Sequence, residues 1–468
     1  MAKRPIEPFR IKAVEPISLL PEAQRRRIIK EVGFNVFRIR AEDVFIDLLT
    51  DSGTGSLSQF QQAGLMIGDE SYAGSRNWFH FEQTVKEIFQ KKFVLPCHQG
   101  RVAENILFST ILKKGDYVPN NTHFDTTRAN TMHKGGIPVD FPCREADDER
   151  SDFPFKGNMD IDRLRAFIQK VGPDRVPVII ITVTNNSVGG LPVSMANIAA
   201  VRGVCDEFGI PLFFDAARYA ENAYFIKRHE SGYEDRTIMS IAQEMCGHAD
   251  GIMMSAKKDG LANMGGFLAI NDEKLLGRLQ EMLILIEGFL TYGGLNGRDL
   301  EAIAIGLKEA LCEDYLDYRV GQIRYFGEML QQVGCPIVTP TGGHGIFADA
   351  GKLLPHIEPA HFPAQSMVVE LYRRGGIRAV EIGSMMFGDK DPNTGKAVAP
   401  KRELVRMAVP RRMYTASHLE YVVDIVAEIV KDKDRLRGYR IVKEPAYLRH
   451  FTCELEEMAG YPAGAISG

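Results

Sequence analysis

The sequence predicts an α/β protein with a mostly parallel β-sheet, and several buried-strand patterns support this fold class. Residues 178–183 (Val-Ile-Ile-Ile-Thr-Val) form a continuous β-branched run, which is typical of a strand buried on both faces. Residues 211–215 and 251–255 repeat the pattern, and residues 265–270 follow as a further strand. A helix that Ser194 is expected to cap separates the first two strands. This alternation predicts parallel strands joined by right-handed crossovers.

The length of 468 residues exceeds what one hydrophobic core usually supports, so we expect two domains. Three prolines near the N-terminus predict an extended arm over residues 1–18, which either exchanges between subunits or is a simple frayed end. Residues 51–325 are expected to form the large domain. Residues 19–50 are expected to join residues 326–468 in a smaller α+β domain.

The expected elements of the smaller domain are short. A strand is expected over residues 335–338 and a helix over residues 365–374. Residues 389–400 are rich in Asp, Lys, Gly and Pro, which predicts an exposed loop.

The composition excludes several classes of partner and of structural site. The 57 basic and 61 acidic residues give a net charge of −4, so neither nucleic acid nor an anionic membrane is expected as a partner. The seven cysteines are odd in number and lack CxxC spacing, which argues against a disulfide framework and against a zinc site. The sequence shows neither a signal peptide nor an apolar run long enough to span a membrane, and we expect a soluble, cytoplasmic protein.

Two polar motifs follow predicted strands, where ligands bind in parallel sheets. Ser255, Lys257 and Lys258 follow the strand at 251–255, and burial there would lower the pKa of a lysine and suit its amine to Schiff-base chemistry. The alternative is a solvated basic turn. Asp215 ends another strand and is followed by Arg218.

These motifs suit pyridoxal 5′-phosphate (PLP). PLP withdraws electrons when its pyridine nitrogen is protonated, which a neighbouring carboxylate such as Asp215 would favour. Arg218 would neutralise the phenolic oxygen of the cofactor. The alternative for Asp215 is a helix N-cap. A third motif, residues 98–101 (His-Gln-Gly-Arg), precedes an apolar helical run over 106–108 and suits a phosphate at a helix N-terminus.

Longer motifs then identify a family. The chain resembles the tryptophanase and tyrosine phenol-lyase family, the PLP-dependent β-eliminating lyases. The resemblance implies PLP-dependent transferase fold type I, like aspartate aminotransferase, with a large mostly parallel sheet domain and a smaller α+β domain. It also implies a dimer-based homo-oligomer, a tetramer by family likeness. The motifs that carry it are residues 7–12, 46–54, 68–75, 221–227, 291–295, 362–365 and 448–452.

The resemblance implies roles for residues around the cofactor. Lys258 would hold PLP as a Schiff base and, once released, take the Cα proton of the substrate. Phe124 would stack on the pyridine ring, and Asn186 would join Arg218 at the phenolic oxygen. The phosphate would be held by a further group: Gln99, Gly100, Arg101, Ser255 and Lys257.

The resemblance also implies residues for the amino-acid substrate and for a cation. Arg406 would bind the substrate carboxylate through its fork-shaped guanidinium. Tyr72 would act as the general acid from a neighbouring subunit, and Thr50 and Ser52 would contact the substrate. A potassium ion would take oxygen ligands from Gly53, Glu70 and Asn263.

Three positions favour tryptophan over tyrosine as substrate. Tyrosine phenol-lyases are similar to one another in having Thr and Arg where this chain has Asp125 and Ile382. The missing arginine would leave a phenolic hydroxyl unmatched, at a cost of roughly 1–3 kcal/mol. The carboxylate of Asp125 and the imidazole of His450 suit an indole N–H instead. Without the family likeness, His450 would be interpreted as a surface histidine.

Some features leave alternatives open. Val102 follows Arg101 where the family usually has Gly, which could shift the phosphate loop. A tyrosine phenol-lyase, or a lyase of a related aromatic amino acid, is the first alternative. The others are a catalytically silent PLP-binding protein and an aminotransferase.

Overall fold

The computed structural model describes residues 4–148, 151–390, 397–445 and 448–459. The chain divides into two compact units. The large unit comprises residues 52–320 and the short segment 411–413. The small unit comprises residues 1–51, 321–410 and 414–468. Within the described parts of the chain, no helix is long and apolar enough to cross a membrane.

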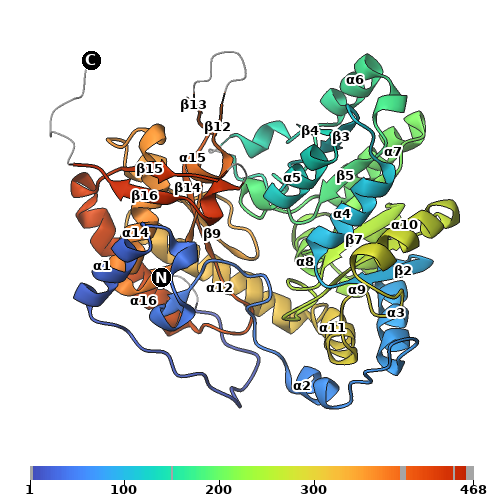
Figure 1. Cartoon of the computed structure of the whole chain (residues 1–468), viewed down its shortest axis with the longest axis horizontal. Helices are drawn as coiled ribbons and strands as arrows, with labels where there is room; N and C mark the ends of the chain where they lie inside the picture. Colours follow the sequence, from blue (N-terminus) through green and yellow to red (C-terminus); the bar gives the residue numbers. More distant parts are fainter. Residues whose placement is uncertain (1–3, 149–150, 391–396, 446–447, 460–468) are drawn as a thin grey trace. The chain divides into compact units, whose positions relative to one another are not determined.

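The large unit is built on one seven-stranded sheet, which Figure 1 shows between its helices. Strands β4, β3, β5, β6 and β7 run parallel, and β8 is antiparallel to β7 and to β2, so the predicted mostly parallel sheet is confirmed. The turn between β7 and β8 is too short for a crossover helix, and β8 therefore returns beside β7 in the opposite direction. The strands are β2 (Phe93–Cys97), β3 (Tyr117–Asn120), β4 (Ile137–Asp140), β5 (Ile179–Thr182), β6 (Leu212–Asp215), β7 (Gly251–Ser255) and β8 (Gly266–Ile270).

Both faces of this sheet are covered by helices, because successive strand residues point to opposite sides. Ile179 and Ile181 join one apolar core with side chains of α3, α6, α7, α8, α9 and α11, whereas Ile180 joins a second core with α4 and α10. The predicted N-cap Ser194 begins α7. The helices are α2 (Gln59–Met66), α3 (Arg76–Phe89), α4 (Gly100–Ile111), α5 (Asp125–His133), α6 (Ile161–Val171), α7 (Met195–Phe208), α8 (Tyr219–His229), α9 (Ile238–Gly247), α10 (Glu273–Ile286) and α11 (Gly297–Glu309).

The small unit is built around a three-stranded antiparallel sheet in the order β11-β14-β9. Three two-stranded pairs accompany it: β1 with β10, β12 with β13, and β15 with β16. The strands are β1 (Ile46–Asp47), β9 (Gly345–Asp349), β10 (Ile377–Arg378), β11 (Val380–Ile382), β12 (Asp389–Lys390), β13 (Ala397–Val398), β14 (Leu404–Ala408), β15 (Tyr439–Lys443) and β16 (Glu454–Glu457). The helices are α1 (Glu22–Glu31), α13 (Ala350–Leu353), α14 (Pro363–Gly375), α15 (Ser384–Phe387) and α16 (Ala416–Lys431), while α12 (Glu313–Gln332) crosses the boundary between the units.

Two expectations for the small unit need correction. The strand expected over 335–338 is only an isolated bridge between Ile337 and Ala348, because Pro336 and Pro340 lack the amide hydrogens that would extend the pairing. The loop expected over 389–400 begins and ends in the paired strands β12 and β13, and residues 391–396 lie outside the described residues. The helix expected over 365–374 is confirmed as part of α14.

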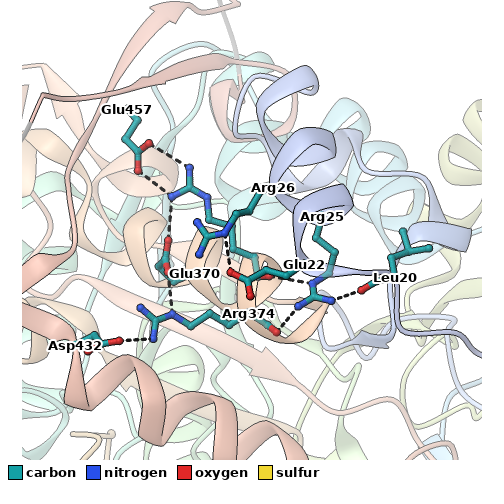
Figure 2. A network of polar contacts seen from close by, with 9 residues as sticks. Leu20, Glu22, Arg25, Arg26, Glu370, Arg374, Asp432 and Glu457 are labelled. Carbon is teal, nitrogen blue, oxygen red and sulfur yellow. Dashed lines mark hydrogen bonds and ion pairs between the residues drawn. The ribbon is translucent and has the colours of Figure 1, made fainter.

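Figure 2 shows how α1 is attached to the C-terminal end of α14. The guanidinium of Arg25 donates from Nε to the carbonyl of Arg373 at 2.9 Å, and its other nitrogens donate to the carbonyls of Arg374 and Leu20. The last carbonyls of a helix lack partners within the helix and carry its partial negative charge. Arg25 is buried and satisfies them with a positive group.

We expect Arg25→Met to lower the free energy of unfolding by roughly 2–3 kcal/mol, because carbonyls at the end of α14 lose a charged donor. Arg26→Met is the matched control. Arg26 bonds to the exposed Glu22 within α1, and a surface pair of this kind contributes less than about 1 kcal/mol. Chemical denaturation of both variants measures the difference, and equal losses would contradict the role of Arg25.

Candidate active site

Lys258 lies in the turn that joins β7 to β8, at the carboxyl end of the sheet. Its Nζ lies 5.8 Å from the centroid of the Phe124 ring. Phe124 is the N-cap residue of α5, which follows β3. The two neighbouring segments therefore bring an amine and an aromatic face together, as the residue roles implied by the sequence require.

Asp215 lies at the end of β6, and its Oδ1 accepts a hydrogen bond from the amide of Ala217 at 3.2 Å. The N-cap residue of α8 is Arg218, so the alternative interpretation of Asp215 as the N-cap of this helix is wrong. Arg218 is buried, and its amide donates to the carbonyl of Val183 beyond β5. Asn186 is also buried and follows β5 in a short 3₁₀ helix. A carboxylate, a guanidinium and an amide thus follow two adjacent strands.

A close approach between α4 and β7 creates a site suited to an anion. Gln99 is the N-cap residue and Gly100 the first residue of α4. A Cβ on Gly100 would lie 2.7 Å from the Cβ of Ser255, so no larger residue fits there. Burial and the charge of Arg101 lower the pKa of Lys257. The free amides of a helix start and two cationic side chains suit a phosphate group.

Val102 points away from this site. Its side chain is buried and belongs to the apolar core that α4 and α10 share. The valine at this position therefore adds a core contact two residues after the first residue of α4.

The sequence analysis missed Glu104, which lies on α4, the helix whose first residues form the candidate anion site. It is buried on α4 and accepts hydrogen bonds from Thr127 Oγ1 at 2.6 Å and Asn130 Nδ2 at 3.0 Å, both on α5. Burial and the charge of Asp215 raise the pKa of Glu104 to about 7. The available sequence signal was an acidic residue between core positions of an apolar helix. Asp125, the first residue of α5, accepts from the amide of Thr126 at 2.6 Å.

A buried ion cluster beside the lysine was also missed. Asp259 follows Lys258 and accepts hydrogen bonds from two backbone amides at the start of α8, at 2.9 and 3.0 Å. Nη2 of Arg411 lies 2.8 Å from Asp259 Oδ1 and 2.9 Å from Glu221 Oε1, and Arg319 also pairs with Glu221 at 3.3 Å. Burial and the charge of Glu221 raise the pKa of Asp259 to about 6. Arg411 comes from a distant segment, so no local pattern could reveal this pairing.

The small unit brings together three residues assigned to the substrate. Arg406 lies on β14 opposite Val380 of β11, and Ile382 ends β11. His450, in a 3₁₀ helix over Arg449–Phe451, is buried and is not the surface histidine that its position in the sequence suggested. Burial, together with the charges of Arg406 and Arg449, lowers the pKa of His450 to about 4, so this imidazole is neutral at neutral pH. Thr50 belongs to the same unit.

The remaining predicted residues lie on the large unit, to which Ser52 also belongs. The Tyr72 side chain is 70% exposed and contacts the rings of Phe289 and Tyr292, with centroids 5.8 and 5.2 Å away. A hydrogen bond with Tyr292 raises the pKa of Tyr72.

The residues assigned to a potassium ion are joined only in part. Asn263 Nδ2 donates to the carbonyl oxygen of Gly53 at 3.0 Å. The carboxylate of Glu70 instead accepts from the amide of Gly297 at 3.4 Å and lies 3.5 Å from Nε of Arg298. The described contacts therefore join two of the three expected ligands.

Comparison with known proteins identifies the family of this chain. A model of the β-eliminating lyase family matches residues 47–425. A tryptophanase from Salinibacter ruber is 52% identical over 97% of this chain and 96% of its own length. A tyrosine phenol-lyase from Clostridium tetani is 48% identical over 97% of this chain and 99% of its own. A tryptophanase from Hyphomonas neptunium is 49% identical, with coverages of 97% and 99%.

A solved structure shows the same fold at low sequence identity. A chain in a complex of SepCysS with the SepCysE N-terminal domain is similar over 85% of this chain and 97% of its own, with a TM-score of 0.55 and 16% identity. The family implies PLP as cofactor. The aromatic face near Lys258, the buried Arg218 and the cationic start of α4 fit its ring, its phenolic oxygen and its phosphate. The family likeness inferred from the motifs is confirmed: this chain belongs to the β-eliminating lyases.

Proposed function

We propose that this enzyme cleaves L-tryptophan by β-elimination and releases indole, pyruvate and ammonium. The observation that carries the proposal is the amine of Lys258 above the Phe124 ring, with Asp215 at the end of a nearby strand. Tryptophanases are among the relatives that match nearly the whole chain.

The residues of the large unit suit the bond cleavage at Cα. PLP, when bound, supplies an electron sink for the electrons left by the departing proton. Lys258 Nζ takes that proton, Asp215 holds a proton at the pyridine nitrogen, and Arg218 with Asn186 orients the phenolic oxygen. Gln99, Gly100, Arg101, Ser255 and Lys257 hold the phosphate.

Other residues bind the carboxylate of the substrate and protonate its leaving group. Arg406 binds the carboxylate, and Thr50 and Ser52 contact the substrate. Tyr72, whose raised pKa keeps its hydroxyl protonated, donates a proton to the leaving carbon from a neighbouring subunit.

Three side chains favour indole over phenol as the leaving group. Asp125 and the neutral imidazole of His450 can each accept a hydrogen bond from an indole N–H. Ile382 offers no partner for a phenolic hydroxyl. Tyrosine phenol-lyases that are 48% identical to this chain make tyrosine the second candidate substrate.

Assembly, cation and compartment complete the proposal. Exposed apolar side chains of the large unit, among them Phe60, Met66 and Leu285, suit burial in a dimer-based homotetramer. Gly53, Asn263 and Glu70 are assigned to a potassium ion in that assembly. All seven cysteines are free, which supports a reducing cytoplasm.

The choice of substrate is tested by assaying indole from L-tryptophan and phenol from L-tyrosine side by side, with and without potassium. We expect kcat/KM for indole release to exceed that for phenol release at least tenfold, which corresponds to about 1.4 kcal/mol. Phenol release in excess would favour the second candidate. A protein that binds PLP but forms no pyruvate from any amino acid would be a silent binder, and pyridoxamine phosphate among the products would indicate an aminotransferase.

The role of Lys258 is tested by trapping its bond to the cofactor. After borohydride reduction, peptide mapping should place the adduct on Lys258 and leave the adjacent Lys257 unmodified. Lys258→Ala should lower pyruvate formation by at least roughly 100-fold, because the general base is lost. An adduct on another lysine, or none, would contradict the assignment.

The burial of His450 predicts a pH-dependent stability. Between pH 6.5 and about 4 the unfolded chain binds a proton at His450 that the folded chain does not, so this contribution to stability falls as the pH falls. The expected slope is at most about 1.4 kcal/mol per pH unit. His450→Gln should flatten it, whereas His229→Gln, which removes a less buried histidine of lowered pKa, should flatten it less. Denaturation series at several pH values measure the slopes, and an unchanged slope in His450→Gln would refute the prediction.

A further inference from the structure

The turn between Ile382 and β12 is held by side chains from two directions. It comprises residues 383–388 and contains the short helix α15. The buried carboxylate of Glu381 accepts hydrogen bonds from the backbone amides of Gly383 and Met385, both at 2.9 Å, and from that of Met386 at 3.0 Å. One side chain therefore binds most of the free amides at the start of the turn.

A second buried carboxylate binds a different amide of the turn, that of Ser384. Glu403, adjacent to β14, accepts from the amide and from the hydroxyl of Ser384, the amide lying 3.1 Å away. A Cβ on Gly383 would lie 2.3 Å from Glu403 and 2.8 Å from Glu381. Only glycine lets both carboxylates approach. Burial and the charge of Glu403 raise the pKa of Glu381 to about 8.

Arg449 holds the carbonyl side of the turn. Its Nε donates to the carbonyl of Met385 at 2.8 Å, and its Nη2 donates to the carbonyls of Ser384 at 2.6 Å and Gly388 at 3.4 Å. A Cβ on Gly388 would lie 2.9 Å from Nη2 of Arg449. The arginine fork thus fits against both ends of the turn.

Two of the three side chains that hold the turn are sequence neighbours of the residues assigned to the leaving group in this unit. Glu381 precedes Ile382, and Arg449 precedes His450. On its other side, His450 packs against the ring of Phe37 at a centroid distance of 5.9 Å. We propose that Glu381 and Arg449 are positioning residues that fix Ile382 and His450 relative to each other by gripping the same turn, and thereby set the preference for an aromatic leaving group.

The inference rests on the proposed function. The residue assigned to the substrate carboxylate and the residues assigned to the leaving group are held by different parts of the small unit. The backbone of Arg406 is held by the pairing of β14 with β11 and β9. Loosening the turn should therefore displace the leaving-group residues and leave the carboxylate contact in place. The resulting decrease in kcat/KM should be largest for substrates with a large aromatic leaving group.

The test compares two substrates in one variant. Arg449→Lys keeps the charge but loses the fork that reaches several carbonyls. We expect kcat/KM for L-tryptophan to fall roughly 10- to 100-fold, because small displacements of positioned groups have effects of this size. S-Methyl-L-cysteine, which has a small leaving group, should change little. Cofactor content and absorption spectrum should match those of the unaltered enzyme.

Arg374→Lys is the matched control. Arg374 is also partly buried in the small unit and also bonds to a backbone carbonyl, but its partners are Glu370, Glu428 and Asp432. The ratio of the two activities should be unchanged in this variant. Glu381→Gln provides a second test from the amide side of the turn and decides the matter if Arg449→Lys does not fold.

Equal losses of kcat/KM with both substrates, or no loss with tryptophan, would overturn the positioning role of Glu381 and Arg449. Its failure is distinct from failure of the proposed function. If the unaltered enzyme releases phenol from tyrosine rather than indole from tryptophan, the substrate assignment is wrong. The ratio of tyrosine to S-methyl-L-cysteine activity in the variants then tests the positioning role of Glu381 and Arg449.

Discussion

The close approach of α4 to the end of β7 is the constraint on which the site of the large unit depends. It requires Gly100, because any side chain would meet Ser255. The approach directs the free amides of a helix start toward the turn that carries Lys257 and Lys258. A phosphate bound there would be fixed relative to the reactive amine by backbone, which is more rigid than side chains alone.

Buried charges hold the surroundings of that turn. Asp259 joins it to the start of α8, and Arg411 and Arg319 neutralise the carboxylates of Asp259 and Glu221. Removing one partner of such a cluster leaves an unmatched buried charge, whereas the complete cluster can be tolerated. The small unit differs, since Glu381, Glu403 and Arg449 bind the backbone amides and carbonyls of a turn beside the residues assigned to the substrate.

Much of the fold could be predicted from local patterns. The runs at 178–183, 211–215 and 251–255 became β5, β6 and β7, because an apolar segment between two helices has few alternatives to a central strand. The segment at 335–338 shows the limit of this reasoning. Pro336 and the nearby Pro340 restrict its pairing to one bridge, between Ile337 and Ala348 of the next strand, β9.

Sequence by itself determined the family, the fold class and the chemical types that the site requires, because long motifs and strand-end residues are local properties of the chain. Tertiary structure decided which charges are buried and which partners they find. The pairing of Asp259 with Arg411, the raised pKa of Glu104 and the neutral state of His450 all depend on residues distant in sequence and on exclusion of water. Desolvation and long-range pairing arise only when the chain folds, so no local pattern contains them.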